Sequence, residues 1–243
     1  MNLWKKILSV TSFTLIVGGI YLFTVWKQRQ NPGVAAQLAA TQTLSQDDLA
    51  VVRTFEQQHY EDVLRLQGTN VWMKNGYTIP YFPFKGGRID FAHPVGLIPP
   101  GQRLDVKKVV KSPVPPAVDD SIGHGSRQVF LVFALPTPAA TTELYATPTG
   151  VMDGAEEKYY CDMLYFYDDP HSIYTHWSKE MWAAIEAHQV KPGMSEIQTR
   201  MSIGQRIRPE GEQEGDRTVV YTLAGKKWTI TYVKDHATEI RAE

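Results

Sequence analysis

Asp168, Asp169, His171 and His176 bring carboxylates and imidazoles close together in the sequence, as a metal site requires. Metal ligands on a helix stand three or four residues apart, so the spacing of His171 and His176 places the two rings on different faces. A helix beginning here explains the same residues, with Asp169 as its N-cap and proline at its first position. We therefore expect a helix start and no metal site.

Gly123-His124-Gly125-Ser126 pairs a potential base with a potential nucleophile. No GxSxG nucleophile elbow accompanies it, and the surrounding sequence is a loop rich in proline and glycine. GxGxxG, the P-loop lysine motif, HExxH and paired CxxC motifs are also absent from the sequence. We therefore predict no catalytic residue, no cofactor and no bound metal. The alternative is an enzyme that acts on cell-envelope material, with His124, Ser126 or Asp168 in its site.

The charge balance and the cysteine content exclude further classes. The chain has 25 Lys and Arg against 26 Asp and Glu, so no basic excess points to a nucleic-acid partner. The single cysteine, Cys161, forms neither an internal disulfide nor a metal knuckle. Because Cys161 lies in the apolar run KYYCDMLYFY, we predict a buried and unreactive thiol.

Five aromatic residues within a region that predicts strands are the best candidates for binding a protein partner. Strand alternation turns some of these rings into the core and leaves others on a face, where exposed aromatics act as binding anchors. Filling the interior of a small sheet protein is the alternative role. The predicted protein-binding residues are Trp72, Tyr77, Tyr81, Phe82 and Phe84.

The elements that position these residues begin with an uncharged segment, Ile7 to Trp26. A helix of about 20 residues is about 30 Å long and matches the hydrocarbon thickness of a bilayer. WKQRQNPG follows at once, which disfavours a cleaved signal peptide. We predict a cytoplasmic tip (1–6), a single-pass bacterial inner-membrane anchor in contact with lipid (7–26) and a linker (27–44), with the body in the periplasm.

Residues 45–168 predict one helix followed by antiparallel strands. Ser45 is a helix cap before an apolar-periodic run that ends at Gly68. Asn75-Gly76 and Gly86-Gly87 are hairpin turns between short aromatic strands, and RLDVKKVV alternates like a further strand. The strand spacing and the LIPPG turn in residues 68–111 resemble a bacterial SH3-like module, which implies a small β-barrel.

Residues 169–243 predict helices and a hairpin. An apolar helical face follows Pro170, and Ser178 caps a second helix if the run breaks there. Ser195 and Gln198 fit a capping box, and a hairpin follows around Ala224-Gly225. With Gly193-Met194-Ser195 and Gly204, residues 173–240 are similar to the small modules of outer-membrane-assembly lipoproteins and β-lactamase-inhibitor proteins.

Together these patterns predict an α+β protein in which a transmembrane helix precedes an SH3-like barrel and a helix-helix-hairpin module. The predicted function is binding without catalysis, as a membrane-anchored extracytoplasmic envelope or assembly factor, or as an accessory subunit of a membrane complex. The protein partner is not identified by the sequence. A purely structural subunit of a larger membrane complex is the third reading.

Overall fold

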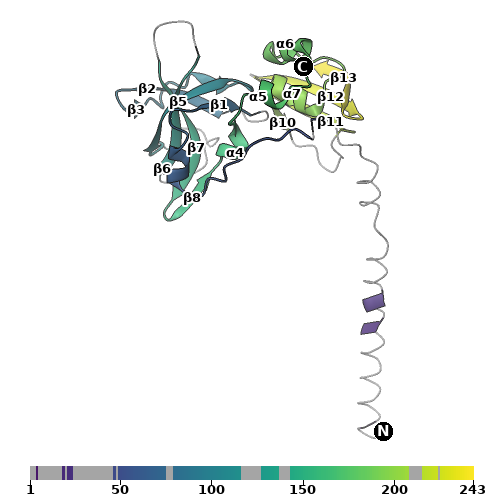
Figure 1. Cartoon of the computed structure of the whole chain (residues 1–243), viewed down its shortest axis with the longest axis horizontal. Coiled ribbons are helices and arrows are strands. Elements are labelled where there is room, and N and C mark those ends of the chain that lie inside the picture. The colour runs from purple at the N-terminus through teal and green to yellow at the C-terminus, as the bar shows by residue number, and fades with distance from the viewer. Residues whose placement is uncertain are drawn as a thin grey trace. The chain divides into compact units, whose positions relative to one another are not determined.

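A computed structural model describes residues 4, 18–19, 21–23, 46–47, 49–74, 79–115, 127–136, 143–207, 215–223 and 225–243. The chain divides into two compact units, Met1–Leu49 and Ala50–Glu243. Nearly all described residues belong to the second unit, which contains two antiparallel sheets (Figure 1).

The predicted membrane anchor is corrected by the structure. Of the segment Ile7 to Trp26, residues 18–19 and 21–23 are described, all helical, and the rest lies outside the described residues. Across the described part of the chain, no helix is long and apolar enough to cross a membrane. A span needs about 20 apolar residues, whereas α6 and α7 have 8 residues each. The single-pass inner-membrane location with a periplasmic body is therefore not supported.

The larger sheet has nine strands in the order β3-β2-β7-β6-β5-β1-β9, with β4 paired to β2 and β8 paired to β7. Each described pairing in it is antiparallel. The strands are β1 (Asn70–Met73), β2 (Ile79–Lys85), β3 (Arg88–Ile89), β4 (Gly96–Ile98), β5 (Arg103–Ser112), β6 (Arg127–Ala134), β7 (Tyr145–Asp153), β8 (Glu156–Tyr159) and β9 (Tyr165–Phe166).

Strand β6 lies near the middle of this sheet and is buried on both faces. Its sequence RQVFLVFA has no polar residue after Gln128, so the alternation of side chains delivers apolar groups to both sides. Val129, Leu131 and Phe133 belong to one apolar cluster, and Phe130 and Val132 belong to another on the opposite face. The sheet therefore has a core on each side.

The predicted SH3-like barrel over residues 68–111 is also corrected. Strand β1 pairs with β5 and β9, and β2 pairs with β3, β4 and β7, so the two strands flanking Asn75-Gly76 are not partners among the described pairings. The predicted Asn75-Gly76 turn itself lies outside the described residues. The second predicted hairpin is confirmed, since β2 pairs with β3 across Gly86 and Gly87, whose φ angles are 56° and 78°.

The helix predicted from Ser45 to Gly68 is mostly wrong. Residues 50–58, here called the strap, have no helix or strand, and α3 covers Tyr60–Leu64 alone. Val51, Val52, Thr54 and Phe55 are poorer helix formers than straight-chain residues, because their side chains crowd the preceding turn. Contacts with distant residues, described below, then hold the strap in an irregular conformation.

The C-terminal part joins short helices to a four-stranded antiparallel sheet in the order β10-β11-β12-β13. Asp169, Ser178 and Ser195 cap three of these helices as predicted, and Gln198 completes the capping box with Ser195. The elements are α4 (Cys161–Leu164), α5 (Pro170–Ile173), α6 (Lys179–Glu186), α7 (Glu196–Ile203), β10 (Gln205–Ile207), β11 (Thr218–Leu223), β12 (Lys226–Val233) and β13 (His236–Ala242).

The fold class is therefore corrected from α+β with a membrane helix to a mostly β fold. Antiparallel strands dominate both sheets, and the described helices are short. Sequence reasoning overestimated helix because the strap and the segment around Ser178 carry apolar residues at helical spacing. In the structure, contacts with residues distant in the chain leave the strap irregular, and the helical run after Pro170 is broken before Ser178.

Candidate binding site

A cleft of about 260 Å³ lies where the turn before β5 meets helices α5, α6 and α7. Its walls are aromatic, aliphatic and proline side chains, and its polar groups are one amide, one guanidinium, two carboxylates and two imidazoles. The lining residues are Trp72, Pro99, Pro100, Gly101, Gln102, Arg103, Asp169, Pro170, His171, Trp182, Ile185, Glu186, His188 and Met201. The cleft is large enough for one or two side chains of a partner, and smaller than a typical drug-sized pocket.

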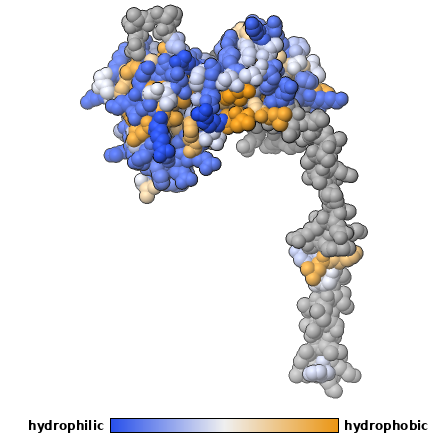
Figure 2. Space-filling model, viewed as in Figure 1, coloured by the Kyte–Doolittle hydropathy of each residue, from blue (hydrophilic) through white to orange (hydrophobic). Residues whose placement is uncertain are grey.

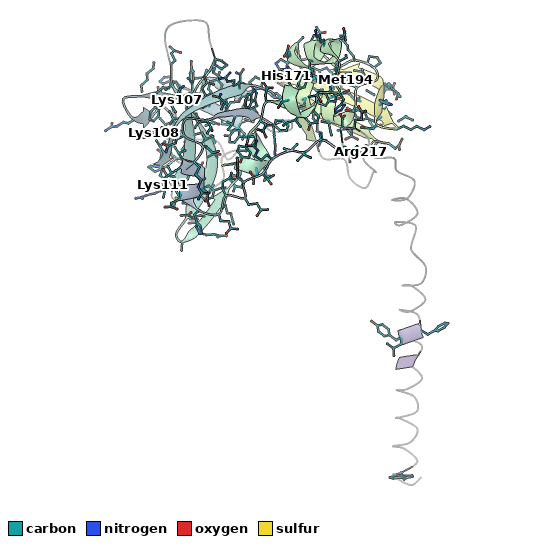
Figure 3. All side chains as sticks on the ribbon, viewed as in Figure 1. Lys107, Lys108, Lys111, His171, Met194 and Arg217 are labelled. Carbon is teal, nitrogen blue, oxygen red and sulfur yellow. The ribbon has the colours of Figure 1, made fainter. Side chains whose placement is uncertain are left out.

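His171 bridges two carboxylates at this cleft. Its Nδ1 lies 2.9 Å from Asp169 Oδ1, and its Nε2 lies 3.1 Å from Glu186 Oε1. The imidazole also stacks on the Trp182 ring at a centroid distance of 3.9 Å. These contacts fix α5 against α6, and they occupy both ring nitrogens. Figure 3 shows His171 on the helical side of the C-terminal part.

Trp72 is the predicted binding residue that the structure places in the cleft. It comes from β1, where it pairs with Arg103 on one side and Phe166 on the other. Its side chain is half-buried and packs against the apolar core of the C-terminal part. Trp72 thus acts both as core for the neighbouring helices and as one wall of the cleft.

The other predicted aromatics do not gather with Trp72. Tyr81 packs against the core on one face of the large sheet, with its ring centroid 5.3 Å from that of Tyr145. Phe82 is 2% exposed, and Phe84 packs against the core on the opposite face. Tyr77 lies outside the described residues. The described members are therefore divided between two faces of one sheet.

The residues considered for catalysis or metal binding are also dispersed. Asp168 Oδ1 accepts a hydrogen bond of 2.7 Å from Arg53, and the ring of His176 lies 6.0 Å from that of Trp177. Over the residues that the structure describes, no group of three metal-ligand side chains is present. His124 and Ser126 lie outside the described residues.

Cys161 is buried, as predicted. Its Sγ lies 3.3 Å from Thr149 Oγ1, and burial raises the pKa of the thiol to about 11. The thiolate is the reactive form of cysteine, so this group is inert at neutral pH.

The strap is held by groups that lie more than 100 residues later in the sequence. The backbone N–H groups of Phe55 and Glu56 donate to the Asp162 carboxylate, at 3.1 and 2.7 Å to the nearer oxygens. Gln57 Nε2 donates to Tyr167 Oη at 2.8 Å. Burial raises the pKa of Asp162, but hydrogen bonds from Tyr167 and the strap outweigh it and lower this pKa below its ordinary value.

On the face seen in Figure 2, hydrophilic side chains cover most of both sheets, and apolar side chains gather beneath the helices of the C-terminal part. The exposed apolar residues of the strap include Val51 and Phe55. The cleft remains the better candidate site, because it is concave and combines two tryptophans with polar groups.

No protein family, curated protein or solved structure matches this chain.

Sequence reasoning found Trp72 but missed the rest of the cleft. Trp182 and Glu186 lie in the helical run predicted after Pro170, and His171 lies in the predicted helix start, but no pattern in the sequence joins them in one site. The signal that could have found them is the Pro99-Pro100-Gly101 turn, since a rigid turn beside an aromatic strand often forms a wall. Nothing in the sequence places that turn next to α6, which follows it by about 80 residues.

Proposed function

We propose that this chain is a non-catalytic protein-binding protein, an assembly factor or accessory subunit, whose cleft takes an anchor side chain of the partner. The supporting observation is that Trp72 and Trp182 line one cleft together with the Pro99-Pro100 turn. Tryptophan is enriched among residues that dominate binding energy, because it offers a large rigid surface and one hydrogen-bond donor.

The polar groups around the cleft favour recognition over catalysis. His171 lies between the Asp169 and Glu186 carboxylates, and His188 Nδ1 lies 2.7 Å from Ser202 O, so neighbouring groups hold both imidazoles of the cleft in place. Fixed polar groups around an apolar floor instead give a side-chain pocket its orientation and specificity. The anchor side chain that fits is aromatic or apolar, because the two tryptophans and the Pro99-Pro100 turn line the cleft beside its polar groups.

The test uses the full chain carrying an affinity tag and compares the proteins that co-purify with wild type and with two variants. Trp182→Ala removes one aromatic wall, and Gln102→Trp fills the cleft without removing any core side chain. Lys227→Ala, an exposed position on β12, is the matched control. We expect one partner to be retained by wild type and the control and lost by both cleft variants.

Direct titration of the purified partner then measures the effect. Tryptophans that pack against a partner's anchor contribute more than about 2 kcal/mol to binding, so Trp182→Ala should weaken binding by at least about 30-fold. Thermal unfolding of each variant shows whether its fold is intact. If Gln102→Trp folds and binds the partner as tightly as wild type, the cleft is not the binding site. If no partner depends on it, the proposal fails.

A further inference from the structure

A second cavity, of about 230 Å³, lies under the strap and is distinct from the cleft. The strap forms one wall, and α3 with the turn after it and the start of β1 forms the opposite wall. The lining residues are Arg53, Phe55, Asp62, Arg65, Leu66, Thr69, Asn70 and Tyr167. The cavity therefore combines two guanidinium groups with two aromatic rings in a space suited to a small molecule.

Asp62, the acidic residue of the cavity lining, is hydrogen-bonded to nearby backbone groups. Asp62 Oδ2 accepts hydrogen bonds from the N–H groups of Gln58 and His59, at 3.2 and 3.0 Å. The His59 bond is the larger cause that lowers the pKa of Asp62. The Asp62 carboxylate is thus ionised at neutral pH and serves as part of the cap of α3.

The two arginines differ in how firmly they are held. Arg65 Nη2 lies 3.5 Å from Asp62 Oδ1, beyond good hydrogen-bond length, and its side chain is 80% exposed. Arg53 Nη2 donates to Asp168 at 2.7 Å with a side chain that is 56% exposed. Guanidinium presents five donors in a fork, so each group retains donors for an anion in the cavity.

The remaining lining combines apolar surface from Phe55, Leu66 and the Tyr167 ring with the polar side chains of Thr69 and Asn70. Leu66 is 3% exposed and forms part of the wall. The rings of Phe55 and Tyr167 lie 4.5 Å apart at an angle of 59°. Thr69 Oγ1 donates a hydrogen bond of 2.7 Å to Leu66 O, so this hydroxyl can only accept a hydrogen bond from a ligand. A ligand that matches all these surfaces has one anionic end and one compact apolar body.

We propose that this cavity binds a small carboxylate with an aromatic or branched apolar body. The carboxylate accepts hydrogen bonds from Arg53 and Arg65, and the body packs on Phe55, Tyr167 and Leu66. A free organic acid and the C-terminus of a polypeptide ending in an apolar residue share this chemistry. The cavity shares no lining residue with the cleft, and its ligand is additional to the protein partner proposed above.

Calorimetric titration of the full chain with phenylacetate and with its neutral analogue phenylacetamide tests the charge requirement. We expect phenylacetate to bind at least tenfold more tightly. Arg65→Gln should weaken phenylacetate binding at least tenfold without unfolding the protein, because the Arg65 side chain is largely exposed. Arg241→Gln, an exposed arginine on β13 paired with Glu239, is the control and should bind as wild type does.

Two further variants separate ligand binding by Arg53 from its ion pair with Asp168, which holds the strap in place. Arg53→Gln removes the guanidinium, whereas Asp168→Asn weakens the same ion pair and leaves the guanidinium free. We expect a loss of at least tenfold for the first and no loss for the second. Equal losses in both variants would mean that Arg53 acts by holding the strap, and would overturn its assigned role.

N-acetylphenylalanine distinguishes the two sources of the carboxylate. Binding at least tenfold tighter than phenylacetate identifies a chain terminus as the ligand, and equal or weaker binding identifies a free acid; both outcomes support the site. The proposal is overturned if neither acid binds, if phenylacetamide binds as well as phenylacetate, or if Arg65→Gln leaves the affinity unchanged.

Discussion

The two sheets of this protein are stabilised in different ways. The large sheet is buried by apolar side chains on both faces, with β6 supplying Val129, Leu131 and Phe133 to one core and Phe130 and Val132 to the other. The C-terminal sheet also has an apolar core, but a buried ion pair and a buried tyrosine pair lie within the same part of the chain.

The ion pair links the first residue of α7 to Arg217, which directly precedes β11. Glu196 and Arg217 side chains are 1% and 8% exposed, and two hydrogen bonds of 2.9 and 2.7 Å join them. Gly215 N also donates to Glu196 at 2.8 Å. Close by in the same sheet, Tyr232 Oη donates to Tyr221 Oη at 3.0 Å. The start of α7 is therefore positioned by directional contacts rather than by shape alone.

The two kinds of core should respond differently to substitution. An apolar core accepts other side chains of similar volume, because its contacts have no direction. A buried ion pair gives little net stability, yet removal of one partner leaves a charge that water cannot reach. We therefore expect the large sheet to respond to lost volume and the C-terminal part to respond to lost pairing.

The largest effect should follow from Arg217→Met, which leaves Glu196 buried without its guanidinium partner. We expect the free energy of unfolding to fall by about 3–5 kcal/mol, because the desolvated carboxylate loses its compensating charge. Urea unfolding followed by tryptophan fluorescence measures the change.

The matched control is the double variant Glu196→Gln with Arg217→Met. Glutamine removes the charge and keeps an oxygen that accepts from Gly215 N. Stability should recover most of the loss, and if the double variant is as unstable as Arg217→Met, volume rather than charge governs this part of the chain.

Leu131→Ala tests the large sheet by removing volume. Leu131 is fully buried on β6, so we expect a loss of about 2–5 kcal/mol from the removed contacts and the remaining cavity. Leu131→Met keeps the volume and should cost less than about 1.5 kcal/mol. Equal losses in the two variants would contradict the idea that this core depends on volume alone.

Ser195→Ala removes a smaller directional contact in the C-terminal part. Ser195 Oγ accepts from Gln198 N at 3.2 Å and caps α7. Its loss should lower stability by about 0.5–2 kcal/mol, with Ser195→Thr as the control that keeps the cap. Thermal unfolding measures both variants; a threonine variant as unstable as the alanine variant would assign the effect to packing.

The smallest effect should be the response of the strap to acid. Because its pKa is lowered in the folded state, Asp162 contributes stability above the ordinary carboxyl pKa of 3.8, and this contribution is lost as the pH falls through the lower folded pKa. Hydrogen exchange at Phe55 N–H and Glu56 N–H should therefore speed up in that acidic range beyond the intrinsic change.

Asp162→Asn is the control for this pH dependence. The amide cannot ionise, so the Phe55 and Glu56 N–H groups should be less protected from hydrogen exchange at neutral pH. Their protection should no longer change over the acidic range in which Asp162 titrates in the wild type. If the variant keeps the acid-dependent opening seen in wild type, another group controls the strap.

Local patterns in the sequence determined the parts of the fold that depend on neighbouring residues. The caps at Asp169, Ser178 and Ser195 are present because each side chain reaches a backbone N–H two or three residues away. The Gly86-Gly87 turn forms because glycine readily adopts positive φ. β11 and β12 pair with each other, as the predicted hairpin around Ala224-Gly225 requires.

The candidate site was predicted only in part, through Trp72. Period-two alternation shows that a ring lies on one side of a strand, but it does not show what covers that side. The core of the large sheet covers Tyr81, Phe82 and Phe84, on one face or the other. Trp72 instead packs against the core of the C-terminal part. The cleft is lined jointly by those helices and by the Pro99-Pro100 turn, which are distant in the sequence.

Only the tertiary structure decided the long-range pairings. The residues after β1 predicted a hairpin with β2, yet β1 pairs with β5 and β9. The strap carries a helical apolar spacing, yet Asp162 binds its backbone N–H groups from 106 residues away. The sequence by itself determines contacts within a few residues, because the chain brings those groups together without help. Contacts between distant segments depend on which apolar faces cover one another, and that selection is made only when the whole chain packs.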